Sequence, residues 1–154
     1  MQGPEVAVQE DWLARAAEEV KKQGRESLIV GKTGELAVLH WLQSQGIPAR
    51  EDHPVGRADY FDLLVRGTTI EIKTTTKGEI KVPKDTFDRG RRFGFYIGVK
   101  LSLPQKRAWI CGYAKKEDVR QGKVIRIEGK AYYALSLAAL KPVEQLLPYL
   151  RGEW

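Results

Sequence analysis

The sequence contains no asparagine, one cysteine (Cys111), one methionine and two histidines among its 154 residues. A single cysteine excludes a disulfide framework within the chain, and it excludes zinc or iron–sulfur sites built from several cysteines. No apolar run approaches the roughly 20 residues of a membrane helix, and the N-terminus MQGPEVAVQEDW lacks the pattern of a signal peptide. We therefore expect a cytoplasmic protein with no membrane partner. The scarcity of Asn, Met and Cys is typical of a heat-adapted source.

Positive charge is what the chain has in excess. The formal net charge is +6, 30% of the residues are charged and 42% are hydrophobic. This hydrophobic content is ordinary for a globular protein, and 154 residues suffice for one domain with a proper core. We expect a single domain over residues 1–154. A basic balance suits an anionic partner such as nucleic acid.

Two helices are predicted in the N-terminal part, within about residues 8–45. The first covers residues 8–23, where the apolar residues share one face, and the second covers residues 33–45 with Thr33 as N-cap and Gly46 as the stop. The second helix is apolar around most of its circumference, so we expect it to be buried. Glu35 shares the face of Leu39 and Leu42. An acid that points into the protein needs a partner.

A hairpin is predicted in residues 61–73, which read FDLLVRGTTIEIK, within a unit of about residues 58–76. A two-residue turn at Arg66-Gly67 places Asp62 opposite Glu71, with Cβ atoms roughly 4.5–5.5 Å apart. Because a strand alternates its faces, Glu71 and Lys73 point the same way. Two opposed carboxylates repel each other unless a cation lies between them. With the nearby lysine they form a site for a hard divalent metal beside a phosphate.

The remaining elements complete a mixed α and β pattern. Strands are predicted at 49–52, 93–101 and 107–114, a hairpin at 123–127 and 131–135, and short helical segments after Pro83, at 115–121 and at 142–147. We expect an α/β (α+β) fold with a central mixed sheet flanked by helices, and a C-terminal hairpin and helix extension over about residues 122–150. The late aromatics Trp109, Tyr113, Tyr132 and Tyr133 are interpreted as core residues.

The ordered set of a helix with Glu35, a strand with Asp62 and a strand with Glu71-Ile72-Lys73 resembles the PD-(D/E)XK nuclease superfamily. The resemblance covers roughly residues 31–100, and Phe61 replaces the proline that precedes the family's Asp. It implies a restriction-endonuclease-like core and a Mg²⁺ site, with Mn²⁺ as substitute. The implied ligands are Asp62, Glu71, the backbone carbonyl of Ile72, and Glu35. Lys73 would act on the attacking water.

Within that superfamily the small size is similar to archaeal-type Holliday junction resolvases and small phage or repair nucleases. The resemblance therefore implies a DNA endonuclease of recombination, repair or phage DNA processing, acting on duplex or branched DNA, and it implies a homodimer. A catalytically inactive nucleic-acid-binding protein and an RNA endonuclease are the alternatives. The residues expected to contact DNA are Arg57, Thr75, Lys77, Lys81, Arg89, Arg91 and Arg92.

Other sites receive less support from the sequence. Gly31-Lys32-Thr33 is similar to the end of a phosphate-binding P-loop, but Glu26 stands where that motif needs its first glycine. Gly34 is expected to let DNA or backbone pass close to Glu35. His40 is interpreted as structural, and His53 is expected near the mouth of the hairpin site, where a phosphate contact and a plain loop role are equally consistent with the sequence.

Overall fold

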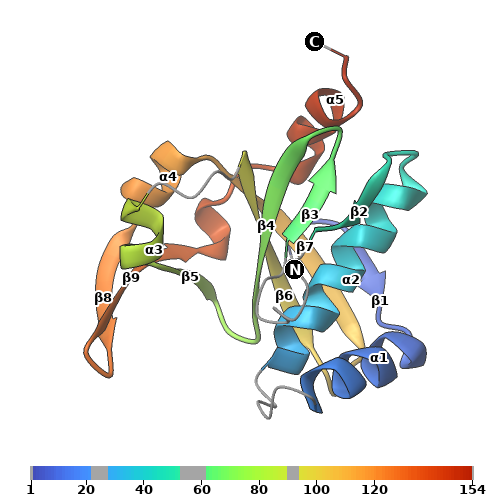
Figure 1. Ribbon diagram of the computed structural model, residues 1–154, viewed down its shortest axis with the longest axis horizontal. Helices are drawn as coiled ribbons and strands as arrows, with labels where there is room; N and C mark the ends of the chain where they lie inside the picture. Colours follow the sequence, from blue (N-terminus) through green and yellow to red (C-terminus); the bar gives the residue numbers. More distant parts are fainter. Residues whose placement is uncertain (1, 22–27, 53–61, 90–93, 154) are drawn as a thin grey trace.

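The computed structural model describes residues 2–21, 28–52, 62–89 and 94–153. Its main sheet has six strands, and their order is β1 (Glu5–Ala7), β7 (Arg107–Ala114), β6 (Phe95–Ser102), β4 (Thr68–Thr75), β3 (Asp62–Val65) and β2 (Ala49–Glu51) (Figure 1). Strands β4 and β6 are parallel, whereas every other neighbouring pair is antiparallel. The predicted fold class, a mixed sheet flanked by helices, is confirmed.

Helices α1 (Glu10–Lys21) and α2 (Leu28–Ser44) cover one face of this sheet (Figure 1). The main core lies between these helices and the sheet. It contains Leu36, Val38 and Leu42 from α2, and Ile70 and Ile72 from β4. We call this side of the sheet the α2 face. The side chains of β4 alternate between the two faces, so its odd-numbered residues point away from α2.

A second, smaller sheet packs against the opposite face. It consists of β5 (Glu79–Pro83), β9 (Lys130–Ser136) and β8 (Lys123–Ile127), all antiparallel, and it is accompanied by α3 (Lys84–Asp88) and α4 (Lys116–Arg120) (Figure 1). A second core joins this lobe to β6 and β7. Its buried residues are Ile80, Val82, Phe87, Tyr96, Cys111, Ala114, Val119, Tyr133, Leu135, Leu137 and Leu140.

The C-terminal part follows β9 as two 3₁₀ helices, η1 (Leu137–Ala139) and η2 (Val143–Leu146), and a last turn, α5 (Leu147–Leu150). The sequence predicted one short helix at 142–147. The helical segment instead reaches Leu150, because Pro148 stands in the first turn of α5, where its missing N–H leaves no helical bond unmade.

One local prediction is wrong, and one strand was not predicted. Helix α2 begins at Leu28, so Thr33 is a buried interior residue of the helix and not its N-cap. Packing overrides the weak helix propensity of this β-branched and glycine-containing stretch, since Val30 packs against the main core. Strand β1 was not predicted, and it adds an edge beside β7. None of the helices in the described part of the chain is long and apolar enough to cross a membrane.

Candidate active site

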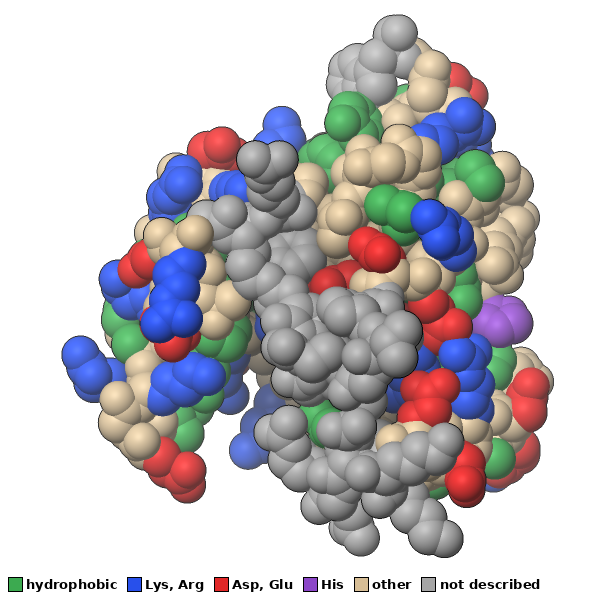
Figure 2. Space-filling view, in the orientation of Figure 1, with side chains coloured by type: hydrophobic (Ala, Val, Ile, Leu, Met, Phe, Trp, Pro, Cys, Tyr) green, Lys and Arg blue, Asp and Glu red, His purple; other side chains and the backbone are tan. Residues whose placement is uncertain are grey.

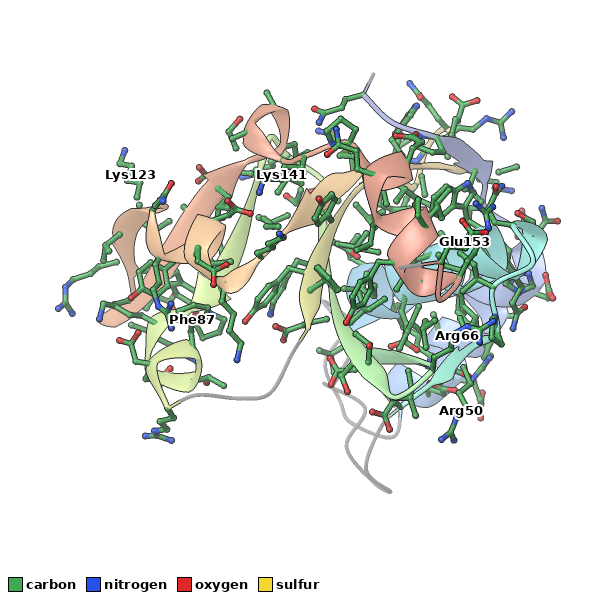
Figure 3. The ribbon with its side chains drawn as sticks, turned by 90° about the horizontal axis from the view of Figure 1, so that it is seen from above. Arg50, Arg66, Phe87, Lys123, Lys141 and Glu153 are labelled. Carbon is green, nitrogen blue, oxygen red and sulfur yellow. The ribbon has the colours of Figure 1, made fainter. Side chains whose placement is uncertain are left out.

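The β3–β4 hairpin has the predicted register. Val65 pairs with Thr68, and Asp62 lies directly opposite Glu71. The turn consists of Arg66 and Gly67, whose φ values are 49° and 82°. Arg66 is labelled in Figure 3. Two consecutive residues with positive φ are typical of the tight turns whose twist matches a hairpin. The local turn chemistry therefore fixes which carboxylates face each other.

The two acids are largely withdrawn from solvent. Asp62 is 5% exposed, and the side chain of Glu71 is 13% exposed. Lys73 supplies a positive charge beside them, with its Nζ 3.3 Å from Glu71 Oε1. The three predicted hairpin residues are thus brought together on the face of β4 opposite α2.

Asp52 is a third acid beside Asp62 and Glu71, and it was not predicted from the sequence. The backbone N–H of Asp52 donates to the carbonyl of Asp62 at 3.0 Å, which extends the β2–β3 pairing by one position beyond Glu51 and Leu63. By alternation, Asp52 therefore shares the face of Asp62. Within the described residues, however, no three His, Cys, Asp or Glu side chains converge closely enough to form a metal-ligand group.

Glu35 lies on the other side of the sheet. Its helix packs on the α2 face, and its side chain is 0% exposed. Lys32 Nζ, itself only 3% exposed, donates to Glu35 Oε1 at 3.0 Å. Lys32 also bonds Glu51 and lies 3.2 Å from Glu19, while Arg15 lies 2.5 Å from Glu51. The structure therefore places Glu35 in an ionic cluster that joins α1, α2 and β2.

The cluster perturbs the ionisation of its members. Burial lowers the pKa of Lys32, but the negative charge of Glu35 and the hydrogen bonds to Glu51 and Glu35 outweigh it, so the pKa is raised. Burial raises the pKa of Glu51, but hydrogen bonds from Arg15 and Lys32 outweigh it and bring the pKa down from 4.5 to about 2. Lys32 and Glu51 are therefore both charged at neutral pH.

Helix α2 approaches β4 most closely at Gly34. A Cβ built on Gly34 would lie 1.8 Å from Thr74 Oγ1, so no side chain fits there. The sequence predicted that DNA or backbone passes close to this glycine, whereas the structure places the side chain of Thr74 of β4 against it. The hydroxyls of Thr33 and Thr74 are buried without a hydrogen-bond partner among the described residues.

The residues predicted to contact DNA are spread along the connection from the site strand to the small lobe. Thr75 ends β4 and accepts a hydrogen bond from the backbone N–H of Lys77 at 3.0 Å. Lys81 lies on β5, and Arg89 follows α3. Lys and Arg side chains gather over this lobe in the space-filling view (Figure 2). Arg57, Arg91, Arg92 and His53 lie outside the described residues.

His40 has the structural role expected of it, although it is exposed. Its ring packs against Trp12 with centroids 4.5 Å apart, and this contact joins α1 to α2. Cys111 is buried in the second core, and burial raises the pKa of its thiol. Neither residue belongs to the hairpin site.

The donor set of the hairpin suits a hard divalent cation. Carboxylate oxygens are the ligands that Mg²⁺ prefers, and the ion keeps several waters, so it needs few protein ligands. Asp62 and Glu71 can hold such an ion from two facing strands, with the carbonyl of Ile72 between Glu71 and Lys73 in sequence. The two positive charges of such an ion would offset the repulsion between the two facing carboxylates.

Comparison with known proteins gives a family match. A family described as a protein of unknown function (DUF1822) matches residues 35–153. This range begins at Glu35 and contains the hairpin, both sheets and the C-terminal helices. Neither the curated proteins nor the solved structures yield a match.

Proposed function

The chain belongs to the DUF1822 family, and we propose that it is a Mg²⁺-dependent DNA endonuclease whose active site is the β3–β4 hairpin. The observation that supports this most directly is the facing pair Asp62–Glu71 with Lys73 beside it. This geometry matches the Asp and Glu-X-Lys arrangement of the PD-(D/E)XK nucleases that the sequence resembles.

A bound Mg²⁺ would polarise the phosphate and lower the pKa of water. Asp62 and Glu71 would hold the ion between the strands. Lys73 would orient the attacking water and balance the charge that develops on the phosphate. Because Nζ of Lys73 lies 3.3 Å from Glu71, its ammonium is fixed at the edge of the carboxylate pair, where a phosphate would approach.

The role of Glu35 in this proposal differs from that of the hairpin acids. Glu35 accepts a hydrogen bond from Lys32, so its carboxylate also holds together the ionic cluster of α1, α2 and β2. A direct metal contact by Glu35 remains a prediction of the resemblance.

The substrate is proposed to be duplex or branched DNA, in recombination, repair or phage DNA processing, with a homodimer as in the resolvases that the sequence resembles. Lys77, Lys81 and Arg89 would follow the phosphate backbone from the end of β4 onto the lobe. The Mn²⁺ ion should replace Mg²⁺ at the site.

Isosteric variants test the proposal. Calorimetry with Mn²⁺ should show that Asp62→Asn and Glu71→Gln each lose binding, because either change removes one of the two facing charges. Lys73→Ala should keep Mn²⁺ binding yet lose cleavage of plasmid and junction DNA. The matched control is Glu117→Gln, which changes an exposed acid on α4. Both binding and cleavage should be unchanged there.

The proposal fails if Asp62→Asn and Glu71→Gln bind Mn²⁺ as the wild type does. If the wild type binds Mn²⁺ and DNA but cleaves no nucleic acid, the chain is a binding protein on this fold. Cleavage of RNA in place of DNA would retain the site and change the substrate.

A further inference from the structure

The small sheet has one face in the core and one face outside it. On β9, Tyr133 and Leu135 belong to the second core, as do Ile80 and Val82 on the neighbouring β5. Helices α3 and α4 contribute Phe87 and Val119 to the same core, so they cover this inner side. By strand alternation, Tyr132 lies on the other side, which we call the outer face. The prediction that Tyr132 is a core residue is therefore wrong, whereas for Tyr133 it is confirmed.

An apolar strip crosses the outer face. Tyr132 pairs with Pro83 on β5 and with Ile125 on β8, so the three side chains lie side by side. All three are only partly buried. Ile127, the next residue of β8 on this face, is 41% exposed. A tyrosine ring thus stands at the centre of a surface that the helices of the lobe leave uncovered.

Lysines border the strip on both sides. Ala134, two residues after Tyr132 on β9, pairs with Lys81 on β5 and with Lys123 on β8. These two lysines are diagonal neighbours of Tyr132, and diagonal residues on adjacent strands are typically about 7–8 Å apart. On the other side, Nζ of Lys130 lies 5.7 Å from the centroid of the Tyr132 ring. Lys123 stands at the outer corner of the lobe in Figure 3.

Positive charge is concentrated in the half of the chain that contains this lobe. Residues 77–154 contain 17 basic and 8 acidic residues, a net charge of +9, whereas residues 1–76 have a net charge of −3. The basic half contains both segments that form the small sheet. One acid, Glu79, shares the outer face, two positions from Lys81 at the start of β5. A polyanion would therefore be attracted to this lobe.

We propose that the outer face of the small sheet binds single-stranded nucleic acid, with Tyr132 stacking on a base and Lys81, Lys123 and Lys130 contacting phosphates. An aromatic ring among cations fits a single strand, because its bases expose their ring faces, whereas a duplex hides them. The choice of a polynucleotide as the anion rests on the proposed nuclease function. The surface itself is distinct from the hairpin site.

A second copy of the chain fits this face poorly. Strand β8 is the edge of its sheet. This strand carries the charged residues Lys123 and Arg126, and charged side chains on an edge strand, Lys above all, disfavour pairing with another edge. The lysines of this edge therefore disfavour self-association and favour an anion.

The test is binding of a fluorescent thymidine oligonucleotide of about 16 nucleotides, measured by anisotropy in EDTA. The Asp62→Asn variant serves as background, so neither metal nor cleavage enters the measurement. Tyr132→Ala should weaken binding about 5- to 150-fold, and Tyr132→Phe should restore it, because the ring and not the hydroxyl stacks. Lys81→Ala and Lys123→Ala should each flatten the dependence of log affinity on log salt by about 0.7. Ultraviolet crosslinking should join the oligonucleotide to the peptide that contains Tyr132.

Three results would overturn the inference. The first is equal affinity of wild type and Tyr132→Ala, with both proteins folded by circular dichroism. The second is equal competition by a duplex of the same length, which would indicate charge attraction alone. The third is a concentration-dependent dimer that Tyr132→Ala abolishes, which would assign the face to a second copy. Loss of cleavage with binding intact would instead count against the nuclease and leave this surface in place.

Discussion

Lys32 is predicted to contribute most to stability among the charged residues of the structure. Its side chain is 3% exposed, and its ammonium lies among three carboxylates, those of Glu19, Glu35 and Glu51. Replacing Lys32 by Met keeps the apolar stem and removes the ammonium that donates to the fully buried Glu35. Removing one partner of a buried ion pair costs about 3–5 kcal/mol. For a chain of this length that corresponds to a fall in Tm of about 6–20 °C.

A matched control separates the loss of a buried ion pair from the general effect of replacing a lysine by methionine. Lys84 forms an ion pair with Asp88 at 2.6 Å, but both side chains are exposed, at 38% and 43%. Exposed ion pairs on a helix contribute little to stability, because water and salt screen them. Lys84→Met should therefore shift the urea midpoint only slightly. Lys32→Met should shift it by several times as much.

The double variant Lys32→Met/Glu35→Gln makes the reasoning specific. It replaces both Lys32 and Glu35, which bond each other in the wild type. The double variant should therefore be more stable than the sum of the two single changes implies. Coupled residues deviate from additivity by about 0.5–3 kcal/mol. Urea unfolding of the four proteins measures this deviation. If Lys32→Met is no more costly than Lys84→Met, or if the two changes simply add, the cluster does not hold the helices together.

Two further predictions concern the same region. The Glu51 carboxyl has a folded pKa of about 2 against an ordinary value of 4.5, so its contribution is complete above pH 4.5 and is lost as the pH falls toward 2. Urea unfolding between pH 6 and 3 should show this loss, and Glu51→Gln should lack it; equal pH dependence in both proteins would contradict the assignment. Gly34→Ala should destabilise the fold by about 1–3 kcal/mol, because the new methyl would meet Thr74. Adding Thr74→Ala should recover part of that loss in thermal unfolding, and no recovery would place the strain elsewhere.

The hairpin was predictable because its determinants are local. A two-residue turn at Arg66-Gly67 fixes the register of both strands, and strand alternation then places Asp62, Glu71 and Lys73. The same reasoning found that Glu35 points inward. Its cation was also within reach of sequence reasoning, since Lys32 lies three residues earlier on the same helix, where side chains are neighbours.

The rest depended on contacts between distant segments. Whether Tyr132 or Tyr133 enters the core follows from which face of β9 meets α3 and α4, and no local pattern specifies this. The position of Glu35 relative to the hairpin depends likewise on which face of the sheet α2 covers. Glu51 completes the cluster from a strand far along the chain. Tertiary packing decides such questions, and local propensity does not.

The order of the strands along the chain has a consequence for how this protein could change. The small sheet is assembled from two segments, β5 with α3 and then α4 through β9, and the β6–β7 hairpin of the main sheet lies between them in the sequence. No single cut releases the lobe, and no single insertion adds it to a finished main sheet. A graft of the Tyr132 surface onto a related scaffold would need both segments at once. The lobe and the core therefore form one inheritable unit, and any binding property of the lobe changes by substitution on its surface and not by exchange of a module.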